Sequence, residues 1–137
     1  SDDHANPHGF EGWQDNARDQ GAEQFALLGD LVGYGADPVA VVERAQALAA
    51  GGALLIKGNH DAMAVAPPAE VKTVGESTAT WTHAQLSDSQ RLFLDHLPLT
   101  LQQDSLLLVH ASVDDPALWR CVYDEPAAAA ILVAAAA

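Results

Sequence analysis

The sequence predicts an α/β fold built on a largely parallel sheet. Three apolar runs of strand length, at residues 25–28, 53–56 and 106–109, are each followed at once by polar or metal-binding residue types, as is typical of buried strands. A segment whose apolar residues recur at helical spacing, 38–50, separates the first two runs. A strand, a helix and a second strand in this order indicate a parallel α/β layer.

The helix expected at residues 38–50 has a signal at each end. Asp37 is suited to cap its N-terminus, Pro38 takes the first helical position, and Gly51 follows its last turn. A shorter helix is expected earlier, at residues 10–18. Helices and strands therefore alternate through the first part of the chain.

The middle of the chain is less regular. Pro67 and Pro68 break any helix there, so we expect residues 63–82 to wrap the surface and to form part of a site wall. A helix is expected again at residues 87–96, because Ser87 can cap it and apolar residues line one face. The apolar run at residues 106–109 is then expected to be the third buried strand.

Composition narrows the class of protein. The 137 residues include 19 acidic and 6 basic side chains, for a formal charge of -13, which excludes a nucleic-acid polymer as a passive electrostatic partner. No apolar run approaches membrane-spanning length, so no membrane partner is expected. The single cysteine, Cys121, fits a reducing compartment. We expect a single-domain cytoplasmic protein, with its oligomeric state left open.

Side chains able to bind metal ions follow each apolar run and also stand at the start of the chain. Because the carboxyl ends of strands in an open α/β sheet converge on one crevice, clusters far apart in sequence are expected to meet there. The spacing of Asp2 and His4 would place both on the same side of a strand end. The full set is Asp2, His4, Asp30, Asn59, His60, Asp61 and His110.

The mixture of carboxylate, imidazole and amide donors favours first-row transition metals over calcium. Asp30 is placed to bridge two ions about 3.5 to 4 Å apart, the separation found in two-metal phosphatases. The sequence therefore predicts two divalent ions, manganese first, with iron, zinc or nickel as alternatives.

The order of these motifs resembles that of the calcineurin-like metallophosphoesterase superfamily: Asp2-x-His4, then Gly29-Asp30, then Gly58-Asn59-His60-Asp61, and later His110. Residues 28–38, 108–112 and 116–119 resemble its small bacterial phosphodiesterase-like branch in particular. The resemblance implies a four-layer α-β-β-α sandwich, only partly present in this chain. It also implies a hydrolase that acts on phosphate esters.

The resemblance further implies a role for each metal-binding residue. Asp2 and His4 would hold the first ion, Asp30 would bridge, and Asn59 and His110 would hold the second. A hydroxide between the ions would attack phosphorus in line.

Four further residues are expected to serve catalysis or substrate binding. The resemblance implies that His60 is not a ligand but stabilises the phosphoryl oxygens and protonates the leaving alkoxide, with Asp61 orienting its ring. Asn6 and Tyr34 each follow a metal motif on a loop that should face the crevice. A contact with a small-molecule phosphate ester is expected for either, with a role in the turn as the alternative.

The sequence departs from the family pattern in one important respect. The family closes its site with a Gly-His-Thr-x-His type of segment, and no Gly-His pair follows His110. We therefore expect residues 1–137 to be a single metallophosphoesterase domain truncated at both ends. Without that segment, a weakened or vacant metal site with little activity is expected.

The substrate alternatives differ in how well the motifs support them. Where protein phosphatases have Asp-Arg-Gly and a later Arg, this chain has Val32, Gly33 and Lys57, which argues against a phosphoprotein. A small phosphodiester or phosphomonoester, such as a nucleotide, is favoured. The alternatives are a protein phosphatase, a diadenosine tetraphosphate hydrolase, and a non-catalytic phosphate-binding remnant of the same fold.

Overall fold

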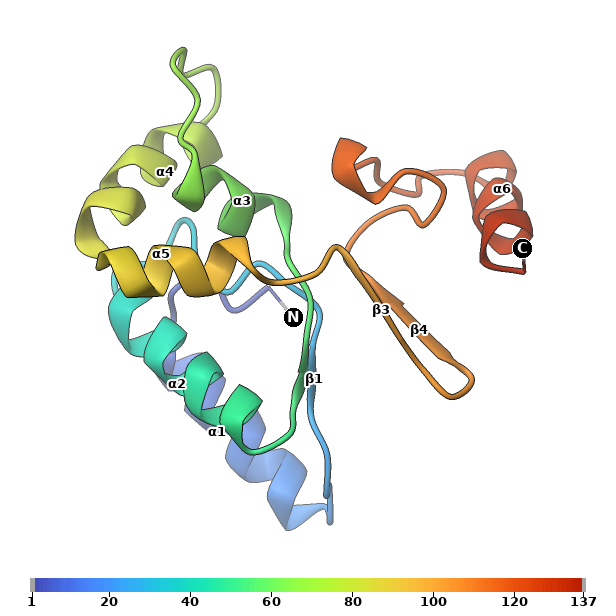
Figure 1. Ribbon diagram of the computed structural model, residues 1–137, viewed down its shortest axis with the longest axis horizontal. Coiled ribbons are helices and arrows are strands. Elements are labelled where there is room, and N and C mark those ends of the chain that lie inside the picture. The colour runs from blue at the N-terminus through green and yellow to red at the C-terminus, as the bar shows by residue number, and fades with distance from the viewer. Residues whose placement is uncertain (1, 137) are drawn as a thin grey trace.

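Residues 2–136 of the computed structural model form six α-helices and two two-stranded sheets, which confirms the predicted α/β class (Figure 1). None of these helices combines the length and the apolar character needed to cross a membrane. In chain order the elements are α1 (Pro7–Asp19), β1 (Ala26–Leu27), α2 (Pro38–Ala50), β2 (Leu54–Leu55), α3 (Asn59–Val65), α4 (Val74–Gln85), α5 (Asp88–Asp95), β3 (Thr100–Gln103), β4 (Leu106–Val109), the short 3-10 helix η1 (Pro116–Leu118) and α6 (Glu125–Ala135).

The predicted parallel strand-helix-strand unit is present. Strand β1 pairs in parallel with β2, with Ala26 opposite Leu54 and Leu27 opposite Leu55, and α2 connects them. The Asp37 side chain accepts a hydrogen bond from the Ala40 N–H, as expected for the helix cap. The strands are shorter than the apolar runs that predicted them.

The core lies between this sheet and the helices. Phe10 of α1, Val42 of α2 and Leu94 of α5 are fully buried together with Leu27 of β1. Helices α1 and α2 lie on one side of β1, as Figure 1 shows. Burying such large apolar side chains stabilises each by about 1.5 to 3 kcal/mol. The core thus fixes the position of the loops that follow β1 and β2.

The third apolar run does not form a buried strand of the parallel sheet. It is β4, which pairs antiparallel with β3 in a separate hairpin, and Leu106 remains 59% exposed. The chain reverses at Asp104, whose φ of 52° is a left-handed turn conformation, so the two strands pair with each other. Figure 1 shows this hairpin and α6 lying away from α1 and α2.

Helix α4 occupies part of the segment expected to be irregular. Its start is a capping box: the Glu76 N–H donates to the Thr73 hydroxyl (3.1 Å), and the Thr73 N–H donates to the Glu76 carboxylate (2.8 Å). Such a reciprocal pair, four residues long, is a recognised helix start in sequence. The prolines at 67 and 68 end the preceding helix but do not prevent this one.

Loss of the capping box should weaken α4 measurably. Thr73→Ala removes the acceptor for the Glu76 N–H and is expected to lower the free energy of unfolding by about 1 kcal/mol. Urea denaturation followed by circular dichroism measures the change. Thr80→Ala, at an exposed interior position of the same helix, is the control. Equal stability of the two variants would contradict the cap assignment.

Candidate metal centre

The N-terminal segment lies along the loop that follows β1. The N–H groups of Asp2, His4 and Ala5 donate to the carbonyls of residues 29, 30 and 31, at 3.2, 3.0 and 2.8 Å. Asp2 and His4 have left-handed φ angles of 59° and 45°, so they do not have the extended conformation on which the spacing argument depends. Backbone pairing with the loop, rather than strand alternation, brings them beside Asp30.

Asp30 lies at the centre of the cluster. Its Oδ2 is 3.8 Å from Nε2 of His4 and 3.5 Å from Nε2 of His110, while its Oδ1 accepts a hydrogen bond from the His60 N–H at 3.0 Å. Potential ligand atoms of Asp2, Asp30 and His110 lie within 4.8 Å of one another, as do those of His4, Asp30 and His60. One carboxylate thus belongs to two groups of potential metal ligands.

The two histidines nearest Asp30 present the nitrogen that a metal requires. His4 Nδ1 lies 3.1 Å from the Val32 carbonyl, and His110 Nδ1 lies 2.7 Å from the Leu28 carbonyl. A carbonyl can only accept, so each Nδ1 carries the hydrogen and each neutral ring has its lone pair on Nε2. Histidine ligands are commonly held in this way by a backbone carbonyl behind the ring. The donor set therefore fits a pair of divalent ions.

The side chain of Asn59 faces Nε2 of His110. Its Oδ1 lies 3.1 Å from His110 Nε2, and it is the first residue of α3. The structure therefore brings together Asn59 and His110, although His110 arrives from the antiparallel hairpin and not from the parallel sheet.

The charges of Asp30 and His110 depend on each other. Burial alone would raise the pKa of Asp30, but the hydrogen bonds and charges of His110 and His60 together outweigh it, so that pKa is lowered. The hydrogen bond to Asp30 raises the pKa of His110 to about 9, against the effect of burial. A metal ion bound between His110 and Asp30 would replace the imidazolium proton as the positive charge that faces the Asp30 carboxylate.

His60 is buried beside this centre without a hydrogen bond to its ring among residues 2–136. Its ring centroid lies 4.9 Å from that of His4 and 4.6 Å from that of Tyr34. Burial lowers the pKa of His60, aided by the charges of His4 and His110, while the charge of Asp30 acts in the opposite direction.

Asp61 is placed differently from the expectation that it orients the His60 ring. Its fully buried carboxylate accepts four backbone N–H bonds, from Asp30, Leu31, Val32 and Gly58, at 2.9 to 3.2 Å. Burial raises its pKa to about 6, although these hydrogen bonds act against the rise. Asp61 thus fastens the loop after β1 to the start of α3, and the predicted bond to the ring is absent from residues 2–136.

Replacing Asp61 should loosen this junction. In Asp61→Asn, the amide offers one oxygen and turns its NH2 group toward backbone donors, so we expect a loss of about 2 to 4 kcal/mol in the free energy of unfolding. Urea unfolding of the metal-free protein in EDTA measures it. Asp15→Asn, at an exposed site on α1, should change stability by less than about 0.5 kcal/mol. Identical behaviour of the two variants would refute this role.

A cleft of ≈ 650 Å³ opens beside the centre. Four of the residues selected from sequence, Asp2, His4, Asn6 and Tyr34, are among those that line it. The Asn6 side chain is also the N-cap of α1, accepting from the Gly9 N–H at 3.1 Å, which is the turn role held as its alternative. Tyr34 is 54% exposed there.

The backbone around the centre is strained. Besides Asp2 and His4, the non-glycine residues Asp30 and Tyr34 have left-handed φ angles of 53° and 57°. Such conformations cost about 1 to 3 kcal/mol each and gather at functional sites. Their clustering here supports the assignment of this region as the site.

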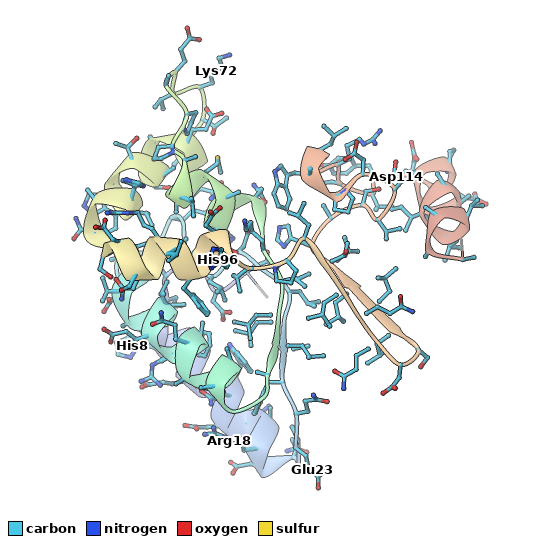
Figure 2. The ribbon with its side chains drawn as sticks, in the orientation of Figure 1. His8, Arg18, Glu23, Lys72, His96 and Asp114 are labelled. Carbon is cyan, nitrogen blue, oxygen red and sulfur yellow. The ribbon has the colours of Figure 1, made fainter. Side chains whose placement is uncertain are left out.

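Two neighbours of the site were missed from sequence. The ring of Trp119, itself at a left-handed φ of 54°, lies 6.1 Å from that of His110. Gly75, on α4, adjoins His60. The Thr73 and Glu76 capping box was a signal for that helix. No sequence signal marked either contact. Figure 2 shows the loop before α4 with Lys72 at its outer end.

Comparison with known proteins bears on the fold of the chain. No protein-family model matches the sequence. An uncharacterised protein of Methanocaldococcus jannaschii is 27% identical over 131 residues, which are 91% of this chain and 53% of that protein. The crystal structure of a metallophosphoesterase from Sphaerobacter thermophilus superposes with a TM-score of 0.80 at 29% identity, over 97% of this chain and 53% of that one.

A second solved structure, described as a candidate diadenosine tetraphosphatase, superposes with a TM-score of 0.60 at 24% identity, over 83% of this chain and 49% of that one. At this identity the match supports the fold alone. The chain spans about half the length of the proteins it matches. It has, in part, the fold of the calcineurin-like metallophosphoesterase superfamily, and the resemblance predicted from its motifs is confirmed.

Proposed function

We propose that the protein is a metal-dependent hydrolase of phosphate esters. The observation that carries the proposal is the position of Asp30 Oδ2 between the Nε2 atoms of His4 and His110, 3.8 and 3.5 Å away. Both rings are fixed from behind by backbone carbonyls, which is how proteins orient histidine ligands. The structural match to a metallophosphoesterase supports the same conclusion.

The proposed ligands divide into two sets that share one carboxylate. Asp2, His4 and Asp30 would hold one divalent ion, and Asp30, Asn59 and His110 the other. Manganese suits this mixture of oxygen and imidazole donors, and iron, zinc or nickel are alternatives. When bound, such a pair activates water for attack on phosphorus and neutralises the phosphoryl oxygens. We also propose that residues 1–137 belong to a single metallophosphoesterase domain.

His60 is proposed as the general acid. Its ring adjoins Asp30 and has no hydrogen bond within residues 2–136, so it is available to a substrate. Its Nδ1 is close to the backbone of Gly33, which leaves Nε2 to donate a proton to the departing alkoxide oxygen. The negative charge of a bound phosphate favours the protonated ring.

The favoured substrate is a small phosphodiester or phosphomonoester such as a nucleotide. Tyr34 presents an exposed aromatic ring next to His4 and His60, where it can pack against the alcohol part of a substrate. Asn6, on the same cleft, retains an amide NH2 group for a hydrogen bond. Dinucleoside polyphosphates are the second substrate class, because a diadenosine tetraphosphate hydrolase is among the alternatives that the motifs leave open.

The test is turnover by the manganese-loaded full-length protein, with metal content measured by mass spectrometry. Bis-p-nitrophenyl phosphate or p-nitrophenyl phosphate should be hydrolysed faster than a phosphopeptide, and a dinucleoside polyphosphate tests the second class. Two ions per chain with turnover support the enzyme. A protein that binds phosphate but no metal, and hydrolyses none of the four, is the non-catalytic remnant instead.

A further inference from the structure

The ring of His60 is enclosed on several sides. A Cβ atom at Gly33 would lie 2.5 Å from His60 Nδ1, and one at Gly75 would lie 2.8 Å from His60 Cε1. The rings of Tyr34 and His4 lie against it, with centroids 4.6 and 4.9 Å away. Because no hydrogen bond holds this ring within residues 2–136, the packing of its neighbours contributes to its orientation.

Gly75 contributes to this packing from a separate element. It is the second residue of α4 and is buried, and its φ lies outside the left-handed range, so its backbone would accept an L-residue. Alanine is the better helix former at such a position. Space is what excludes it, since the added Cβ would also lie 3.0 Å from the Tyr34 hydroxyl oxygen.

The first turn of α4 is also joined to the loop that carries Tyr34. The Tyr34 N–H donates to the Thr78 hydroxyl oxygen at 3.3 Å, and that hydroxyl donates to the Gly75 carbonyl at 2.8 Å. Displacement of the helix start would therefore shift Tyr34 together with His60.

We propose that Gly75 is a positioning residue, whose bare Cα lets the start of α4 hold the His60 ring against the Asp30 centre. The role rests on the proposed function, in which His60 donates the proton. The carboxylate of Asp61, which the sequence predicted to orient the ring, instead accepts backbone N–H bonds. The residues that adjoin the ring then set its direction in place of a carboxylate.

Gly75→Ala tests the proposal, with Gly12→Ala as the matched control. Gly12 also lies in a helix, but a Cβ there would meet nothing within 4 Å. In the manganese-loaded protein, Gly75→Ala should lower kcat by about 10- to 100-fold, with KM and metal content within about twofold of wild type. In the metal-free protein, the proton NMR signal of His60 Cε1–H, assigned with His60→Ala, should move in Gly75→Ala and stay in place in Gly12→Ala.

A second variant separates displacement of the ring from loss of folding. Adding Tyr34→Phe to Gly75→Ala removes the hydroxyl that the new methyl group meets, so the helix start can relax away from His60. The fall in kcat from Tyr34→Phe to the double variant should therefore be smaller than the fall from wild type to Gly75→Ala. A urea midpoint for Gly75→Ala near that of wild type would show that the loss of kcat does not come from unfolding.

Two results would overturn the role of Gly75. One is wild-type kcat and an unmoved His60 signal in Gly75→Ala; the other is a fall in kcat that follows only the unfolded fraction. If the manganese-loaded wild type itself shows no turnover, the proposed function fails, and the catalytic role of the contact fails with it. The NMR signal then reports only whether the contact exists.

Discussion

Replacing Asp30 with asparagine is expected to empty the metal centre. Asparagine keeps an oxygen for the His60 N–H and tolerates the left-handed backbone at this position. It removes the negative charge that faces both His4 and His110. Loss of a charged ligand shared by two ions should raise the manganese dissociation constant by about 100-fold or more, and hydrolysis should fall to background.

Isothermal titration with manganese, together with metal analysis after dialysis, measures the loss. Asp37→Asn is the matched control, because Asp37 lines the same cleft but serves as a helix cap, a role that asparagine fills equally well. An Asp30→Asn protein that still retains two ions would refute the bridging role. A variant that fails to fold would show a changed circular dichroism spectrum, which the control should not.

Replacing His60 with alanine should lower turnover without releasing the metal ions, unlike the replacement of Asp30. The His60 ring is proposed to move a proton and not to hold metal, so two ions should remain bound while kcat falls by about 10² to 10⁴-fold. The loss should be smaller for an ester whose leaving group needs no proton, such as p-nitrophenolate, than for an alkyl phosphate ester.

Steady-state kinetics on both kinds of ester, with metal content measured in parallel, check this prediction. His83→Ala is a suitable control, since the His83 ring hydrogen-bonds the Ala64 carbonyl and His83 is not among the proposed catalytic, metal-binding or substrate-binding residues. Unchanged turnover in His60→Ala would eliminate the general-acid role. Loss of one ion would make His60 a ligand, in line with its place among the potential ligand groups.

The proximity of Asp30 and Asn59, two of the candidate metal ligands, could be predicted because it follows from general properties of α/β sheets. Asp30 and Asn59 follow paired parallel strands, so their ends had to adjoin. The position of Asp2 and His4 beside Asp30 was anticipated, but their conformation was not. The left-handed φ angles arise from pairing with residues 29–31, a tertiary contact that residue spacing does not encode.

Other features depended on contacts between distant segments. The apolar run at 106–109 has the length of a buried strand, and periodicity cannot distinguish that from a hairpin strand. Asp61 looked like a partner for its neighbour His60, yet its carboxylate is closer to backbone donors of a loop some thirty residues away. The glycine at position 75 has no sequence signature, because what it accommodates is a ring from another helix.

The most direct test of the central claim is anomalous diffraction at the manganese edge from crystals grown with manganese. We predict two peaks, one between Asp30 and His4 and the other between Asp30 and His110, with the Asp30 carboxylate shared by both. Strong peaks at other places on the molecule, with none beside Asp30 at saturating metal, would contradict the assignment of this cluster as a two-metal centre.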